Sequence, residues 1–354
     1  MTHWKRPARS LISWTRLRAP KAIRWNPPTC WATTSMAKNP NPPVVSGFLN
    51  LYKPVGITSM DALRQVKRIT GQRQKVGHGG TMDPLARGVL PVCFGQATRL
   101  MDHVVGGVKR YRMDITLGTS TTTYDAEGEV VKTGDYEGLT EETVAEHLRP
   151  WVGVVQQTPP MYSAVKVDGQ RLYKLARAGV EVEREARPVE IHSITIVKFG
   201  LPTLTVDVEC GGGTYMRSLA HDLGESLGCG AHVSDLERQL CAGFTSDESA
   251  TLEQLEEAVN GPDGWQQFLF PVDWVLRGLK SITLGKQAEE ALRHGQAVTP
   301  DRPQLDAGYL EEYRAYNSDG VFLALVRYDR PSNAWQPVKV LQTESPSPYA
   351  PASV

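Results

Sequence analysis

Residues 77–91 read Gly77-His78-Gly79-Gly80-Thr81-Met82-Asp83-Pro84-Leu85-Ala86-Arg87-Gly88-Val89-Leu90-Pro91, and they place one carboxylate on a constrained loop. The glycines allow backbone conformations closed to other residues, which suits a tight turn. Pro84 lacks an amide proton and favours an extended conformation at Asp83. A carboxylate held in this way is oriented in advance, as catalysis requires. An ordinary Asp-Pro turn has the same composition, so the loop by itself leaves both interpretations open.

A lysine-containing turn precedes this loop. Residues 47–52 predict a short strand, and Thr58 is placed to cap a helix that reaches Ile69. Between the two lies Lys53-Pro54-Val55-Gly56. A strand, a turn and a helix explain most of this pattern without any further role for the lysine.

The segment 64–112 is strongly basic. It holds ten Lys or Arg residues, and the only acids among them are Asp83 and Asp102. Such a segment attracts a polyanion and supplies phosphate contacts, although a solvated basic face has the same composition. Residues 109–118 alternate like a strand. Within them Tyr111 lies between two arginines, as would an aromatic ring that stacks on a base; a tyrosine packed on the core fits equally well.

Two later segments carry further motifs. Residues 157–166 contain Pro159-Pro160-Met161-Tyr162-Ser163, a rigid entry to a turn and a short basic helix over 168–178. Few apolar residues anchor that helix, as expected of a lid that becomes ordered on binding. Residues 211–224 lead from three glycines through Tyr215-Met216-Arg217 into a helix, without the spacing of a nucleotide-binding loop. A helix with a surface arginine would explain this segment as well.

Taken in order, these motifs resemble the bacterial tRNA pseudouridine synthase B family. The similarity runs without a gap from Gly77 to Arg99, and it covers residues 47–275 well and 281–342 weakly. The resemblance implies an α+β pseudouridine synthase fold. In that fold a mixed, largely antiparallel central sheet is flanked by helices, and a small PUA-like β-barrel follows at the C-terminus.

Three positions depart from the common family pattern. Gly79 stands where Thr is frequent, Met82 where Leu is frequent, and Arg87 where Thr or Ser is frequent. None of these differences removes the carboxylate of Asp83. They therefore concern the packing of the loop rather than its chemistry.

The resemblance also implies roles for the site residues. Asp83 would act as a nucleophile or as the base that starts glycal formation, and Tyr111 would stack on the target uracil. Arg217 would pair with Asp83, which would lower the pKa of the carboxyl and keep it ionised. No cofactor and no metal is expected, because the isomerisation adds and removes no atoms. RNA contacts are expected at His78, Gly79, Gly80, Lys53, Arg110, Tyr215, Tyr162, Lys166 and Arg171.

Composition narrows the class of protein. The 354 residues carry 39 basic and 39 acidic side chains, so the net charge does not indicate a nucleic-acid partner. No stretch approaches the roughly 18 uninterrupted apolar residues of a membrane helix, so we expect no membrane association. The five cysteines form no Cys-x-x-Cys pair, which indicates a reducing compartment and no structural zinc site.

The first 46 residues differ from the rest, because they hold eight basic residues and no acidic one. They could form a disordered basic arm that binds RNA phosphates. They could also be an organelle transit peptide, which would allow a plastid location. The third hypothesis is native translation from Met36, and it is favoured because folding signals begin only at Ser46.

The sequence thus predicts a disordered extension (1–46), a catalytic domain (47–277), an RNA-clamping insertion (159–187), a PUA-like RNA-binding domain (281–342) and a disordered tail (343–354). The expected function is that of a cytoplasmic, monomeric synthase that isomerises uridine-55 in the T stem-loop of tRNA. The nearest alternative is a guide-RNA-dependent synthase of the same superfamily, which the length of the clamping insertion disfavours. A non-catalytic RNA chaperone or binding protein is the alternative from another class.

Overall fold

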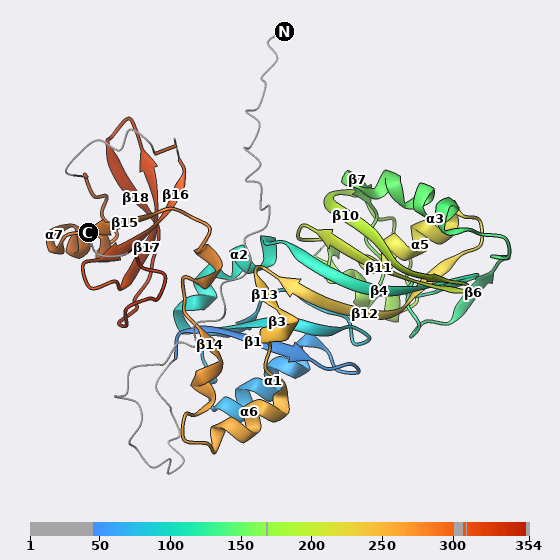
Figure 1. Cartoon of the computed structure of the whole chain (residues 1–354), viewed down its shortest axis with the longest axis horizontal. Helices are drawn as coiled ribbons and strands as arrows, with labels where there is room; N and C mark the ends of the chain where they lie inside the picture. The colour runs from blue at the N-terminus through green and yellow to red at the C-terminus, as the bar shows by residue number, and fades with distance from the viewer. Residues whose placement is uncertain (1–44, 168, 301–306, 309, 352–354) are drawn as a thin grey trace, which may run out of the picture.

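The protein is described here by a computed structural model, which covers residues 45–167, 169–300, 307–308 and 310–351. The chain forms one long sheet with its helices, and a smaller unit follows at the C-terminal end (Figure 1). The hypotheses on the N-terminal extension concern residues outside this range, apart from Val45 and Ser46.

One ten-stranded sheet forms the framework, in the order β14-β1-β3-β12-β4-β11-β10-β7, with β13 on β12 and β2 on β3. Within this sheet, as far as the structure describes it, only the pairing of β3 with β12 is parallel, so the predicted mixed and largely antiparallel sheet is confirmed. The strands are β1 Gly47–Lys53, β2 Val76–His78, β3 Arg87–Phe94, β4 Lys109–Leu117, β7 Gly153–Gln157, β10 Arg187–Gly200, β11 Thr203–Cys210, β12 Ala231–Cys241, β13 Phe244–Thr245 and β14 Leu269–Phe270.

Helices cover the sheet, and three of them, α1, α3 and α6, begin at a threonine whose side chain caps the helix. Thr58 and Asp61 form a reciprocal capping box at the start of α1, and Gly71 ends this helix in the left-handed region. The predicted N-cap Thr140 accepts from the amide of Thr143 at the start of α3. The helices of this part are α1 Ser59–Thr70, α2 Met101–Gly106, α3 Glu141–Leu148, α4 Leu172–Arg177, α5 Met216–Ser226 and α6 Leu252–Val259.

Short elements join these layers. Two small hairpins stand apart from the main sheet, β5 Thr119–Thr121 with β6 Val130–Thr133, and β8 Lys166–Val167 with β9 Gln170–Arg171. The second hairpin and α4 belong to the predicted clamp, residues 159–187. Turns of 3₁₀ helix lie at η2 Gly95–Leu100, η3 Arg149–Trp151, η4 Ser246–Glu248, η5 Trp265–Phe268 and η6 Trp274–Leu276.

The C-terminal unit is a four-stranded sheet with one helix, made of β15 Ser281–Leu284, α7 Lys286–Arg293, β16 Glu312–Asn317, β17 Phe322–Asp329 and β18 Ala334–Val340. Trp335 is 1% exposed and packs against the rings of Tyr313 and Tyr328. A second apolar cluster joins the unit to β1 and β3, since it contains Phe48 and Val89 together with residues of β16 and β17. The two parts therefore share buried surface.

The tail differs from the expectation of disorder. Ser347 Oγ donates to Asp273 Oδ2 at 2.6 Å, and Asp273 is 1% exposed. The ring of Tyr349 packs edge-on against Trp274, and its carbonyl accepts from Arg314 at 3.1 Å. The prediction of disorder is wrong for residues 343–351. Sequence patterns reveal ordered segments through apolar periodicity, whereas polar contacts hold this segment in place.

No helix in the described part of the chain is long and apolar enough to cross a membrane.

Candidate active site

The loop between β2 and β3 holds Asp83 through backbone contacts on both sides. Ser59 Oγ accepts from the amide of Met82 at 2.7 Å and donates to its carbonyl at 3.1 Å. The amide of Gly79 donates to Pro91 O at 2.8 Å, which closes the base of the loop. The Asp83 side chain remains 34% exposed. The loop therefore presents an accessible carboxylate on a fixed backbone, which fits the first of the two interpretations of its sequence.

Gly79 has a packing role in the loop. It is buried, and a Cβ at this position would lie 2.2 Å from Cγ1 of Val104. Its contact with RNA stays a prediction. Gly80 is half-buried with φ +108°, so it supplies the left-handed backbone of the turn.

Arg217 lies in the first turn of α5 and reaches Asp83 from the opposite side of the site. Its Nη2 donates to Asp83 Oδ1 at 2.9 Å and to the carbonyl of Tyr162 at 2.7 Å. Its Nη1 donates to the carbonyl of Thr123 at 3.0 Å. The guanidinium is 4% exposed, so it is a buried contact and not a surface arginine. The contact implied by the family resemblance is present.

Asp125 is a second carboxylate at this guanidinium, and the sequence motifs did not assign a role to it. Its Oδ2 lies 3.5 Å from Nη1 of Arg217, and its side chain is 3% exposed. Its Oδ1 accepts from Thr123 Oγ1 at 2.5 Å and from the amide of Glu127 at 3.1 Å. The signal for this residue is the Asp-Ala-Glu-Gly turn at 125–128, since an aspartate that bonds its own loop is typical of such turns.

The direction of the pKa shift of Asp83 differs from the expectation. Burial raises the pKa of the Asp83 carboxyl above its ordinary value, and the carboxylate of Asp125 raises it further. The guanidinium of Arg217 and the ammonium of Lys53 lower the pKa but do not offset burial. The prediction of a lowered pKa is therefore wrong, because it counted the ion pair and not the loss of water around the acid.

Tyr111 is half-buried on β4, and its hydroxyl is hydrogen-bonded to Arg238 on β12. Burial raises the pKa of Tyr111 to about 12. The hydroxyl is therefore protonated at neutral pH. Arg238 lies on a strand that the sequence patterns did not reveal.

Lys53 is fully buried, which disfavours its predicted contact with RNA. Its Nζ donates to the carbonyls of Pro54 at 2.8 Å, Ile57 at 2.7 Å and Pro84 at 3.4 Å. Burial lowers the pKa of Lys53 to about 8. The lysine ties the turn before α1 to the residue that follows Asp83, which is a structural role.

The remaining predicted RNA-contact residues lie around the site with different exposures. Arg110 is exposed on β4, and His78 is half-buried beside the loop. Tyr162 is half-buried, and its carbonyl is already bonded to Arg217. Tyr215 is half-buried, with its amide and carbonyl held by the side chain of Gln157. Their contacts with RNA stay predictions.

Part of the basic stretch is neutralised within the protein. Arg87 pairs with Asp235, and Arg112 pairs in a bidentate manner with Asp207 at 2.8 Å. These two arginines are less available to phosphates than the sequence suggests. Arg110, which also lies on β4, remains exposed.

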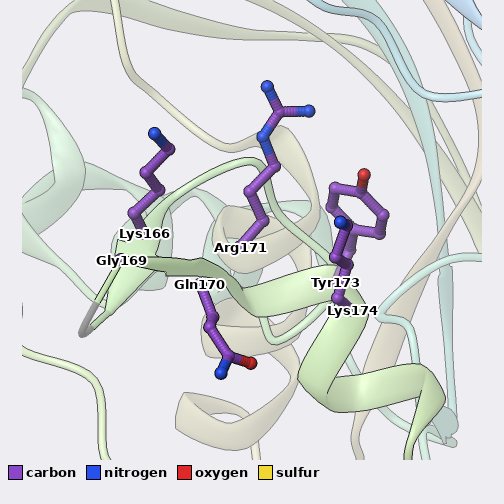
Figure 2. Close-up of a pocket in the computed structure, with 6 residues that line it drawn as sticks. All are labelled: Lys166, Gly169, Gln170, Arg171, Tyr173 and Lys174. Carbon is purple, nitrogen blue, oxygen red and sulfur yellow. The ribbon is translucent and has the colours of Figure 1, made fainter.

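The clamp carries a cationic hollow. Lys166 and Arg171 face each other across the β8–β9 hairpin and project to the same side, whereas Gln170 points the other way (Figure 2). A cavity of about 500 Å³ lies among these residues together with Tyr173 and Lys174. The buried Leu172 anchors the segment, and its amide donates to the carbonyl of Val165 at 2.8 Å.

Two family models match adjacent parts of this chain. The N-terminal domain of TruB family pseudouridylate synthases matches residues 67–216, and the C-terminal domain of tRNA pseudouridylate synthase B matches residues 217–277. The tRNA pseudouridine synthase B of Clostridium perfringens is 39% identical over 287 residues, which are 80% of this chain and 96% of that protein. The chain belongs to the TruB family.

Other TruB proteins show similar likeness. The tRNA pseudouridine synthase B of Dehalococcoides mccartyi is 41% identical over 86% of this chain and 100% of its own length. That of Thiobacillus denitrificans is 42% identical over 79% of this chain and 91% of its own. The resemblance noted from the motifs is thus confirmed, and the chain is an isomerase of a family that acts on RNA.

Solved structures support the fold. A chain of a Cbf5-Nop10-Gar1 complex superposes with a TM-score of 0.64 at 24% identity, over 88% of this TruB chain and 93% of that one. A chain of an archaeal box H/ACA Nop10-Cbf5 complex superposes with a TM-score of 0.62 at 22% identity, over 87% and 89%. The predicted pseudouridine synthase fold is confirmed.

The site is assembled from both halves of the TruB match. Asp83, Tyr111 and Asp125 lie within the first matched region, whereas Arg217 and Arg238 lie within the second. No group of His, Cys, Asp or Glu side chains able to hold a metal ion occurs among the residues that the structure describes.

Proposed function

We propose that this TruB protein converts uridine-55 in the T stem-loop of tRNA into pseudouridine, and that Asp83 supplies the carboxylate for the reaction. The observation that carries the proposal is the 2.9 Å contact between Arg217 Nη2 and Asp83 Oδ1. It joins an accessible acid to a buried cation at a position fixed by the fold. The relatives named tRNA pseudouridine synthase B, 39–42% identical, support tRNA as the substrate.

The chemistry needs one carboxylate beside the ribose. The bond between C1′ and N1 of the uracil breaks, the base turns, and a bond between C1′ and C5 forms while the proton on C5 is lost and N1 gains one. An ionised Asp83 suits attack on C1′ and also removal of a proton from C2′. Arg217 fixes the direction of the carboxylate, because its planar fork donates in defined directions.

Tyr111 supplies the surface for the freed uracil. An aromatic ring under a base contributes roughly 1–3 kcal/mol, which retains the base while it turns. The protonated hydroxyl of Tyr111 can donate to an oxygen of the uracil. This role is implied by the resemblance to the family, and Tyr111 lies on β4, beside the strand that carries Arg238.

RNA binding involves surfaces outside the site. A base in a folded loop must be turned out of its stack, which costs a few kcal/mol, and contacts with the backbone offset that cost. The exposed Lys166, Arg171 and Arg110 are among the cations available for this purpose. We also propose that the C-terminal unit is a PUA-like RNA-binding module and that one chain suffices for activity.

The test uses pure protein and an unmodified tRNA transcript, without cofactor or guide RNA. We expect pseudouridine at position 55, and the same product from a T stem-loop hairpin. Asp83→Asn should abolish the product while tRNA affinity stays within about threefold, since an amide keeps the shape but cannot act as nucleophile or base.

Asp102→Asn is the matched control, because Asp102 is the other acid of the basic segment and its side chain is 92% exposed. It should behave like the wild type. Undiminished turnover of Asp83→Asn would refute the catalytic assignment. A requirement for a guide RNA would favour the guide-dependent branch, and binding without any product would favour an RNA chaperone.

A further inference from the structure

Arg238 is a buried cation with no carboxylate partner in the described part of the chain. It is 1% exposed. Its Nε donates to the carbonyl of Val89 at 2.6 Å, and its Nη2 lies 3.4 Å from the carbonyl of Gly80. Burying a charge without a counter-charge is unfavourable unless its donors are bonded. A methionine or leucine would fill the same space, so packing alone does not explain an arginine here.

The position of Arg238 in the sheet lets one side chain reach two parts of the site. It pairs across the sheet with Tyr111 on β4 and with Gly88 on β3. A β-bulge follows it at Leu240 and redirects the strand. Gly88 has φ +106°, and a Cβ there would lie 2.3 Å from the carbonyl oxygen of Arg238. The two strands are thus held at a separation that only glycine permits.

Each bond of Arg238 involves an element of the proposed site. Gly80 lies at the start of the loop that carries Asp83, Val89 lies in β3 just after that loop, and the hydroxyl of Tyr111 bonds the same guanidinium. A guanidinium only donates, so the oxygen of Tyr111 must accept. The hydroxyl proton of Tyr111 is therefore left available for another acceptor.

We propose that Arg238 is a positioning residue that holds the ring and hydroxyl of Tyr111 in register with the Asp83 loop. This inference rests on the proposed function, since it assigns to Tyr111 the contact with uracil. Arginine suits the task because the N–H groups of its rigid, planar guanidinium donate in several directions, so they can bond Val89, Gly80 and Tyr111 at the same time. Lysine has a single donor centre and glutamine a shorter reach, so neither can make all the bonds.

The charge of Arg238 acts on Tyr111 as well. Burial raises the pKa of the tyrosine, and the guanidinium of Arg238 opposes that rise. The cation thereby makes the hydroxyl a better proton donor than the same tyrosine would be beside a neutral group. Its loss should affect turnover more than tRNA affinity, because Arg238 has no surface that RNA could contact.

A double-mutant cycle on turnover tests the proposal. The variants are Arg238→Gln, Tyr111→Phe and the two combined, measured as kcat and KM on a tRNA transcript. We expect Arg238→Gln to lower kcat about tenfold or more with KM within about threefold, and to have at most about a threefold effect once Tyr111 is Phe. Equal effects of Arg238→Gln in both backgrounds, or no effect in either, would overturn it.

A second cycle reports on the contact itself and does not need activity. Tyr111→Phe leaves one buried donor of Arg238 without its acceptor, so the melting temperature should fall by about 3 °C or more. Arg238→Met combined with Tyr111→Phe should recover part of this loss, because apolar groups then replace both partners. Strictly additive shifts would contradict the contact even if Arg238→Gln failed to fold. Wild-type protein that makes no pseudouridine would refute the proposed function while this melting cycle still decides on the contact.

Discussion

Asp83 and Arg217 are separated by 134 residues in the chain and by 2.9 Å between Oδ1 and Nη2 in the fold. The acid is 34% exposed and the guanidinium 4% exposed. The pair is therefore asymmetric, with a cation fixed by its surroundings and an acid that a substrate can reach. This asymmetry separates catalytic from supporting residues and leads to tests that treat them differently.

Arg217→Lys should lower kcat strongly, because a lysine cannot bond Asp83 and the carbonyls of Thr123 and Tyr162 at the same time. Loss of one preorganised donor typically lowers kcat about 100- to 1,000-fold. Single-turnover rates at saturating tRNA measure this step. The control is Arg68→Lys, at an arginine that is 72% exposed, and it should match the wild type. A wild-type rate for Arg217→Lys would remove its orienting role.

Asp125→Asn should lower kcat less than Asp83→Asn does, because Asp125 acts through Arg217 and touches no substrate. The amide keeps an acceptor for Thr123 and the amide of Glu127, so the loop should remain folded. The loss of a buried charge partner should lower the free energy of unfolding by roughly 1–3 kcal/mol. Denaturant titration and single-turnover kinetics on the same samples check both parts. A kcat as low as that of Asp83→Asn would mean that Asp125 takes part in the chemistry.

The acid limb of the pH–rate profile should lie above the ordinary carboxyl value of 3.8, since burial raises the pKa of Asp83. The ionised form is the active one, so activity falls as the pH falls through that pKa. The charge of Asp125 raises the pKa of Asp83, and Asp125→Asn should therefore move the limb to lower pH. The measurement is kcat by single turnover across the acidic range.

The control for this profile is Asp222→Asn. Burial raises the pKa of Asp222, on α5, to about 6, so it could produce a limb of its own. The limb should stay in place in that variant. A limb that moves with Asp222 and not with Asp125 would contradict the assignment to Asp83.

Much of the fold could be predicted because its signals are local. The capping box of Thr58 and Asp61 defines α1, and alternation defines β4. The central strand β12 was missed. Register shifts after Val233 and after Arg238 break its alternation of inward and outward side chains. In addition, the sequence alone does not distinguish a buried arginine from a solvated one. The strand that lies between β3 and β4 could therefore not be recognised from the sequence.

The site shows the same division. Asp83 is recognisable from the stiff loop around it, whereas its contact with Arg217 depends on tertiary folding and came from family resemblance. The predicted direction of the pKa shift of Asp83 was wrong, because desolvation is a property of the folded site. The orientation of the Lys53 side chain could not be predicted either, since a lysine at the end of a strand can point to water or into the loop.

The cations of the clamp should control tRNA affinity rather than chemistry. Lys166→Ala combined with Arg171→Ala should weaken binding and reduce the slope of log affinity against log salt by roughly one to two, as phosphate contacts are lost. The single-turnover rate at saturating tRNA should stay within about threefold. Gln170→Ala is the control from the same hairpin, because it removes a neutral side chain that also lines the cavity but points away from Lys166 and Arg171 (Figure 2). An unchanged salt slope in the double variant would exclude phosphate contacts at this hollow.

Lys53→Met should show the opposite behaviour, because Lys53 is buried and bonds backbone carbonyls only. Methionine fills a similar volume but leaves those acceptors unpaired, so the free energy of unfolding should fall by roughly 1–3 kcal/mol. The salt dependence of tRNA binding should not change. Lys198→Met, at an exposed lysine of β10, is the control for the loss of a positive charge. A shallower salt slope in Lys53→Met with unchanged stability would indicate that Lys53 contacts RNA. A lysine that stays buried cannot contact phosphates and so cannot release counterions from tRNA.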